Sequence, residues 1–201
     1  MCVKDHKVKV ITALGDDFNR LCKKLSNDII SDYSPDLIIG IATGGEVVAR
    51  AVATEINTPI MIIKRQRRLT KYKSGFKLSK VLPILPRWFN DALRRIEIRY
   101  NEKKFLAKGK VWVPCDVVLI SGDLQALTQF NKILLIDDSV DSGGTMVDCI
   151  NFLQGFLSGN SMIKTAALND TFREPVLIPD FYLYKDTLIR CPWANDVGRD
   201  K

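Results

Sequence analysis

The chain has 201 residues, 46% of them hydrophobic, and a mean hydropathy close to zero, which is typical of one globular domain with a sizeable core. No stretch reaches the roughly 18 uninterrupted apolar residues that a membrane span requires, and the first ten residues lack the apolar core of a secretory signal. We therefore expect a cytoplasmic protein without a membrane partner.

Cysteine and histidine usage excludes several kinds of site. The five cysteines are odd in number and share no CxxC-like spacing, so we expect reduced thiols and neither a zinc site nor a disulfide framework. The single histidine, His6, lies outside every motif, which gives little support to Ser-His or Cys-His nucleophile chemistry.

The net charge of +7 is unevenly distributed along the chain. Residues 64–110 carry 16 Lys or Arg against three acidic residues, so this segment is +13 and the remainder is −6. Such a segment indicates either a solvated surface or an anionic partner. Composition alone does not separate a phosphorylated metabolite from nucleic acid.

Apolar runs alternate with amphipathic patterns along most of the chain. Continuous apolar runs are typical of parallel strands covered on both faces, whereas apolar spacing of three and four residues predicts surface helices. The predicted strands are residues 8–12, 37–41, 59–63, 111–113, 116–120, 132–136 and 163–168. One predicted helix begins at Asp16, and the other three cover residues 46–56, 86–107 and 146–157. This order predicts an α/β fold with a mainly parallel central sheet flanked by helices and a ligand site beyond the carboxyl ends of the strands.

The basic segment interrupts this alternation. We expect residues 66–80 to form a mobile loop and residues 86–107 to form an inserted helical arm with one apolar face. The residues assigned to that face are Trp88, Phe89, Leu93, Ile96, Tyr100 and Phe105.

Two glycine turns each follow a predicted strand and precede a predicted helix. The first is Thr43-Gly44-Gly45, and the second runs from Asp141 to Thr145. Such a junction directs free backbone N–H groups and the positive end of the helix dipole at whatever lies above the turn, which favours anions. For the first turn taken alone, a tight turn without a ligand is the simpler interpretation.

Two adjacent carboxylates, Asp137 and Asp138, separate the strand at residues 132–136 from the second turn. Carboxylates accept hydrogen bonds from adjacent ribose hydroxyls or hold a hydrated metal. The hydroxyls of Ser142 and Thr145 would complete a cradle for a phosphate monoester, so the whole stretch matches a 5-phosphoribosyl group. The alternative is an acidic helix N-cap with a solvated carboxylate pair.

The sequence DDSVDSGGT after an apolar strand resembles the phosphoribosyl-diphosphate (PRPP) binding motif of the type I phosphoribosyltransferases. It is most similar to the purine branch, because Asp141 stands where a third aspartate lies beside N7 of the base. Residues 36–45 resemble the pyrophosphate-binding loop, and residues 186–193 resemble the hood that covers the base. The resemblance implies transfer of 5-phosphoribosyl from PRPP to a nucleobase, with a purine expected, release of pyrophosphate, and Mg²⁺ as cofactor.

The resemblance also implies roles for individual residues. Asp141 would be the general acid/base at the purine, and Asp137, Asp138 and Asp196 would hold the metal. The substrate-binding residues would be Asp137, Asp138, Ser139, Val140, Asp141, Ser142, Gly143, Gly144 and Thr145 for the ribose phosphate, Thr43, Gly44 and Gly45 for pyrophosphate, and Leu188 and Ile189 for the base. Trp193 is interpreted as hood packing.

Three positions depart from the family pattern. Thr43 replaces an Arg or Lys at the leaving group, Asn169 and Asp170 stand where a lysine reads the base, and Leu188 replaces an aromatic residue. These changes leave the accepting base open.

We expect one domain over residues 1–201, with a flexible basic loop and helical insertion at about 64–110 and a hood at about 170–201. Dimers are common for the fold, so a homodimer is among the expected assemblies. Another interpretation is a regulator of the same fold that senses PRPP or nucleotides and binds nucleic acid or a protein through residues 64–110. A third is a catalytically weak effector subunit that works with a partner.

Overall fold

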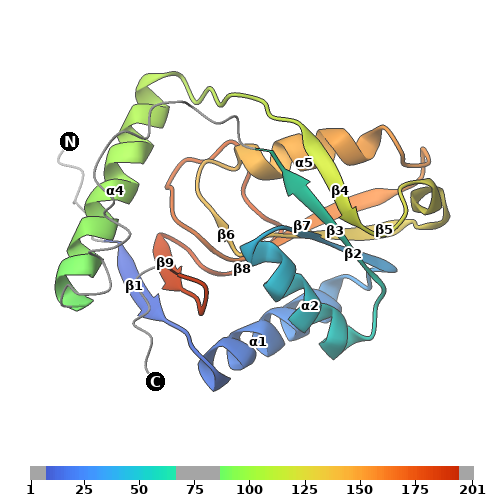
Figure 1. Cartoon of the computed structure of the whole chain (residues 1–201), viewed down its shortest axis with the longest axis horizontal. Helices are drawn as coiled ribbons and strands as arrows, with labels where there is room; N and C mark the ends of the chain where they lie inside the picture. The colour runs from blue at the N-terminus through green and yellow to red at the C-terminus, as the bar shows by residue number, and fades with distance from the viewer. Residues whose placement is uncertain (1–7, 67–86, 195–201) are drawn as a thin grey trace.

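Figure 1 shows the computed structural model, which describes residues 8–66 and 87–194. Its centre is a seven-stranded sheet with the strand order β4-β3-β2-β5-β7-β6, in which β8 also pairs with β7. The strands are β2 (Leu37–Ile41), β3 (Ile60–Arg65), β4 (Val117–Ser121), β5 (Lys132–Ile136), β6 (Ser139–Val140), β7 (Met162–Asp170) and β8 (Phe181–Tyr184). Only β4 runs antiparallel to its neighbour among these described strands, so the predicted mainly parallel sheet is confirmed.

Helices cover both faces of this sheet (Figure 1). Helices α1 (Asp16–Asp32) and α2 (Gly44–Ile56) pack on one face, and α5 (Gly144–Gln154) with the 3₁₀ helix η2 (Gln125–Gln129) packs on the other. Along β5, Leu134 and Ile136 join the first core while Ile133 and Leu135 join the second, and all four side chains are fully buried. Burial on both faces explains why β5 is a continuous apolar run in the sequence.

A separate two-stranded sheet forms the hood. Strand β1 (Lys9–Thr12) pairs in parallel with β9 (Thr187–Arg190), so segments near opposite ends of the chain lie side by side. The sequence pattern predicted β1. It did not predict β6, β8 or β9.

Helix α4 (Arg87–Ala107) is confirmed as a helix, but it is docked on the hood and is not a free arm (Figure 1). Ile98 and Phe105 are buried against Val8 and Phe172. The predicted apolar face is largely wrong, because Ile96 and Tyr100 from that face are 66% and 64% exposed.

Ion pairs strengthen this docking of α4. Arg99 pairs with Asp186, which directly precedes β9, and Arg190 of β9 donates a hydrogen bond to Asp91 at 2.5 Å. Arg95 donates to the backbone oxygen of Val8 at 2.8 Å. Several of the basic residues that the sequence assigned to a solvated or ligand-binding surface therefore stabilise the protein's own structure.

Four further expectations concern a strand, membrane-spanning helices, the cysteines and a loop. Residues 111–113 do not form a strand, and the strand that pairs with β3 begins at Val117. Within residues 8–66 and 87–194, no helix has the length and hydrophobicity to cross a membrane, and Cys22, Cys115, Cys149 and Cys191 are free thiols. The predicted loop at residues 66–80 lies almost wholly outside the described residues.

Candidate functional site

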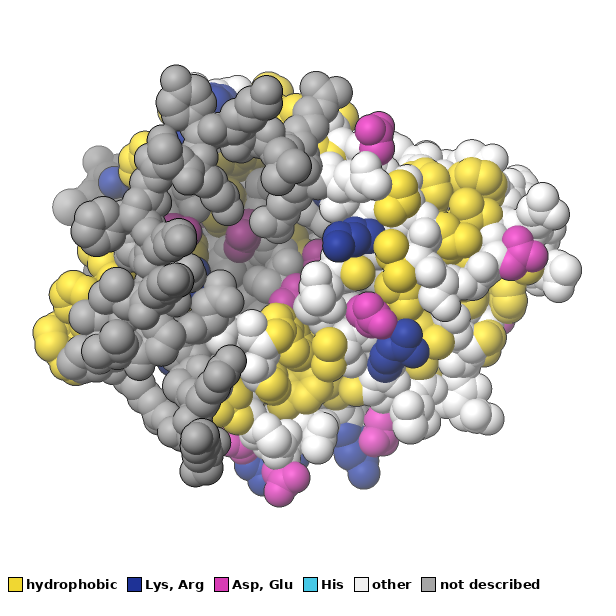
Figure 2. Space-filling model, in the orientation of Figure 1, with side chains coloured by type: hydrophobic (Ala, Val, Ile, Leu, Met, Phe, Trp, Pro, Cys, Tyr) yellow, Lys and Arg dark blue, Asp and Glu magenta, His cyan; other side chains and the backbone are white. Residues whose placement is uncertain are grey.

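A cavity of about 1110 Å³ lies at the carboxyl ends of β2, β3 and β5. In Figure 2, acidic side chains are visible at the bottom of a recess in this face. The predicted site residues that line the cavity are Thr43, Gly44, Asp137, Asp138, Ser139, Val140, Asp141, Ser142, Gly143 and Thr145. The two glycine turns and the carboxylate pair, which the sequence suggested separately, therefore form one site.

The carboxylate pair is held within the sheet. After β5 ends, the backbone N–H of Asp137 donates to Ala166 and the backbone oxygen of Asp138 accepts from Leu168, at 3.0 and 3.2 Å. The chain then continues along β7 as β6. Both side chains therefore project from a backbone that is fixed on either side of them.

The glycines of the first turn allow α2 to approach this pair closely. A Cβ at Gly44 would lie 2.1 Å from Oδ2 of Asp138, and a Cβ at Gly45 would lie 2.7 Å from Cα of Asp137. Gly45 is buried behind the turn and does not line the cavity. Thr43 precedes the helix as its N-cap, after a cis peptide bond from Ala42. The amino end of α2 thus faces the cavity directly beside the carboxylates.

The two carboxylates have different surroundings. Burial, together with the neighbouring charge of Asp138, raises the pKa of the Asp137 carboxyl well above its usual range. Asp138 accepts a hydrogen bond from Nε1 of Trp193 at 3.0 Å, and the Trp193 ring packs edge-on against Phe18. Trp193 therefore lines the cavity in addition to packing against Phe18.

The second turn forms the amino end of α5. Gly143 has φ 82°, a conformation that glycine adopts without strain, and its Ser142 neighbour accepts a hydrogen bond from the N–H of Gly144. Gly144 is buried under the ring of Trp112, from which an added Cβ would lie 2.7 Å. Thr171 donates a hydrogen bond to Oδ1 of Asp141. This backbone geometry suits an anion at the start of α5.

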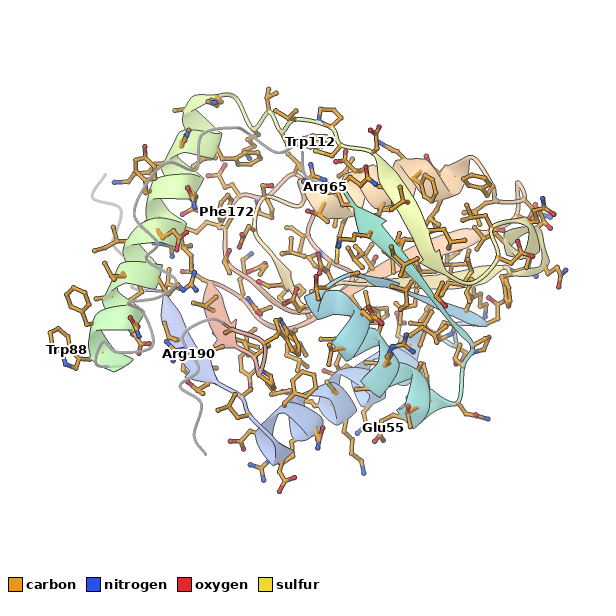
Figure 3. The ribbon with its side chains drawn as sticks, viewed as in Figure 1. Glu55, Arg65, Trp88, Trp112, Phe172 and Arg190 are labelled. Atoms are coloured by element: carbon orange, nitrogen blue, oxygen red, sulfur yellow. The ribbon has the colours of Figure 1, made fainter. Side chains whose placement is uncertain are left out.

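A buried carboxylate behind the turn organises a group that the sequence did not identify, of which Figure 3 labels Arg65 and Trp112. Asp148 of α5 accepts hydrogen bonds from Nε of Arg65 at 2.6 Å, Nε1 of Trp112 at 3.0 Å and the N–H of Cys115 at 3.1 Å. Arg65 and its neighbour Lys64 line the cavity. They supply positive charge from β3, although the sequence showed them only as part of a long basic segment.

The two hood residues predicted to contact the base do not line the cavity. Ile189 is 6% exposed and belongs to the core beneath α1 and α2, whereas Leu188 packs in the cluster beneath α4. Successive side chains of a strand point in opposite directions, so β9 divides this pair between two hydrophobic clusters. Asp196, the third predicted metal ligand, lies outside the described residues.

This arrangement, with a mainly parallel sheet, a carboxylate pair and two helix amino ends around one cavity, is that of a phosphoribosyltransferase. A family model described as "Phosphoribosyl transferase domain" matches residues 8–171, and the chain belongs to this family. No curated protein matches the sequence.

Solved structures share the fold at low sequence identity. A purine phosphoribosyltransferase from Pyrococcus horikoshii Ot3 has a TM-score of 0.58 at 20% identity, with 92% of this chain and 93% of that chain covered. A xanthine-guanine-hypoxanthine phosphoribosyltransferase from Helicobacter pylori has a TM-score of 0.57 at 11% identity, covering 90% and 91%. A hypothetical protein from Neisseria gonorrhoeae with bound ppGpp has a TM-score of 0.57 at 20% identity, covering 94% and 91%. The resemblance seen in the sequence is thereby confirmed, and the fold is shared with purine enzymes.

Proposed function

We propose that the protein transfers the 5-phosphoribosyl group of PRPP to a nucleobase, with a purine as the acceptor, and releases pyrophosphate. One observation carries this proposal: the Asp137–Asp138 pair lies between the amino ends of α2 and α5 in a single cavity. Carboxylates accept from a ribose diol, and each helix amino end favours a phosphate group. The spacing therefore suits a sugar with a phosphate on one side and a diphosphate on the other.

The reaction breaks the bond between C1 of the ribose and a pyrophosphate oxygen and forms a bond between C1 and a nitrogen of the base. Asp137 and Asp138 would accept from the ribose hydroxyls and stabilise positive charge that develops at the sugar. Residues 141–145 would bind the 5′-phosphate, and Thr43 and Gly44 the pyrophosphate, with Lys64 supplying charge that Thr43 lacks. Asp141, which Thr171 orients, would take the proton that the base nitrogen loses.

The carboxylate pair also suits Mg²⁺. Magnesium usually binds through one or two carboxylates plus waters and substrate phosphates, so it does not need a dedicated protein cage. In keeping with this, the part of the chain that the structure describes contains no cluster of three or more metal-ligating side chains. Burial and the neighbouring charge of Asp138 raise the pKa of Asp137, and a cation at the pair would favour the ionised carboxylates. Bound Mg²⁺ would neutralise charge on the diphosphate, and Asp137 and Asp138 would hold it through its waters.

Pyrophosphate release tests the function directly. The protein is incubated with PRPP, Mg²⁺ and a panel of nucleobases, and Asp141→Asn is expected to lower turnover by about 10²- to 10⁴-fold, because the base nitrogen then loses its proton acceptor. Calorimetry should show nearly unchanged PRPP affinity. Asp28→Asn, on the exposed side of α1, is the matched control. Unchanged turnover in Asp141→Asn would remove Asp141 from the mechanism, and no release with any base would overturn the proposed reaction.

A second candidate is a regulator that binds nucleic acid. The observation that favours it is a group of exposed lysines at and beyond the end of α4, namely Lys103, Lys104 and Lys108. If these residues bind RNA, affinity should fall steeply with salt. Replacing all three by Ala should reduce the slope of log affinity against log salt concentration by about three at most. Titration of labelled RNA at several salt concentrations measures this. Binding that is absent, or equal in both proteins, would exclude this surface.

A further inference from the structure

The carboxyl end of β7 fixes two polar residues of the cavity. Nδ2 of Asn169 donates to Oγ of Ser139 at 2.9 Å, and two residues later Thr171 donates to Asp141. Ser139 and Asn169 are also partners in the β6–β7 pairing. The same stretch of backbone therefore sets the direction of Ser139 and of the proposed acid/base.

The orientation of the Asn169 amide is determined by its surroundings. Nδ2 donates a second hydrogen bond, 2.7 Å long, to the backbone oxygen of Thr187, which only accepts. Turning the amide over would place its oxygen against that carbonyl. Oδ1 is buried and has no partner among the described residues. Both donated hydrogen bonds require the amide nitrogen of Asn169.

This geometry makes the Ser139 hydroxyl a donor toward the cavity. Its oxygen already accepts from Asn169, and none of the described residues accepts its proton. Ser139 lines the cavity between Asp138 and Asp141. A hydroxyl has one proton to donate, and here that proton is available to a bound molecule.

Building on the proposed function, we propose that Ser139 is a specificity-determining residue, whose hydroxyl, oriented by Asn169, donates to an acceptor atom of the incoming base. Asp141 accepts the proton of N7 while N9 bonds to C1 of the ribose, and Ser139 offers a donor two residues away. A purine with a carbonyl oxygen on C6, beside N7, satisfies both groups. An amino group at that position would bring a donor against a donor, so the site selects an oxo base over its amino analogue.

Substitutions at the two residues separate this role from simple packing. The measurement is kcat/KM for hypoxanthine and for adenine, followed by pyrophosphate release. Ser139→Ala should lower the value for hypoxanthine roughly 3- to 10-fold and raise that for adenine, because the donor that opposes the amino group is removed, whereas Ser139→Thr keeps the hydroxyl and should keep the preference. Asn169→Asp should shift the preference toward adenine, because a carboxylate accepts the Ser139 proton and leaves the serine lone pairs facing the base.

A binding measurement at equilibrium tests the role of Ser139 independently of the proposed reaction. The ratio of the Kd values for inosine 5′-monophosphate and adenosine 5′-monophosphate is measured by calorimetry in the same proteins and should change in the same direction. No pyrophosphate release with any base would overturn the reaction, and the Kd ratio would still decide the role of Ser139. An unchanged ratio in Ser139→Ala would overturn that role. If Asn169→Asp does not fold, the comparison of Ala with Thr at position 139 decides.

Discussion

The Asp137 carboxyl binds its proton more tightly in the folded protein than in the unfolded chain, because burial and the charge of Asp138 both oppose ionisation. Because the pKa is raised, the folded protein tolerates the protonated carboxyl better than the ionised one. The stability that protonation preserves is complete below the unfolded pKa of about 4 and is lost as the pH rises through the folded pKa. In the metal-free protein, Asp137→Asn should therefore raise the free energy of unfolding at neutral pH and weaken its decline with pH.

Urea denaturation from about pH 5 to pH 8 without divalent cations measures this change. The exposed Asp28→Asn should follow the unsubstituted protein at every pH. Asp137→Asn should at the same time reduce PRPP turnover, so that stability and activity change in opposite directions. Parallel stability curves for all three proteins would contradict the assigned cause of the raised pKa.

Gly44 offers a second test at the level of single residues. A Cβ at this position would overlap the Asp138 carboxylate and approach Nε1 of Trp193 to 2.7 Å. Gly44→Ala should therefore displace α2 or Asp138, cost about 1–3 kcal/mol of stability and abolish PRPP binding. Gly159→Ala is the matched control, because a Cβ there meets nothing within 4 Å. Normal PRPP affinity in Gly44→Ala would show that α2 does not need this close approach.

At the scale of elements, α4 has two isoleucines in opposite environments. Ile98 is 8% exposed in the cluster with Val8 and Phe172, whereas Ile96 is 66% exposed. Ile98→Ala should lower the free energy of unfolding by about 2–5 kcal/mol, and Ile96→Ala should change it by less than about 0.5 kcal/mol. Chemical denaturation of both variants tests whether α4 is docked in solution. Equal, small effects would indicate a helix that is not part of the core.

The same helix shows that a sequence pattern can predict a helix without predicting which of its faces is buried. Its period is helical, and the helix was predicted, but its buried positions include the polar residues Asn90 and Glu102. Glu102 accepts from Arg99 at 2.6 Å and from the N–H of Arg173 at 2.5 Å, so a carboxylate is satisfied where an apolar pattern expects a hydrophobic side chain. The inward face was therefore assigned wrongly, because hydrogen bonds to distant segments, which the pattern does not contain, decide it.

The site shows the same division between local and distant information. Residues 137–145 were predicted because the groups that would bind a ribose phosphate are contiguous, and the buried strand before them has a clear pattern. Arg65, Thr171 and Trp193 reach the cavity or its residues from three other segments. No local pattern predicts such convergence. For the same reason, the alternation of β9 could not show that Leu188 and Ile189 enter separate clusters.

At the scale of the whole molecule, the fold separates the residues proposed to bind substrate from the hood. The strand ends of the central sheet carry the two glycine turns and the carboxylates, whereas the hood is a separate sheet that α4 supports. Trp193, three residues beyond β9, joins the two parts through Asp138. Changes in α4 or in the hood are therefore expected to reach the cavity through this indole and through Asn169, which donates to both Thr187 and Ser139.

The pairing of β1 with β9 has a consequence for how the protein is made. During translation, β1 leaves the ribosome early and has no strand to pair with until almost all the described chain has followed it. Contacts between such distant segments form slowly, and unpaired strand edges are open to wrong association in the meantime. The sheet with its glycine turns can form first, but Asp138 receives the Trp193 indole only after β9 has docked. A nascent chain would thus carry an incomplete ribose site until synthesis passes the hood.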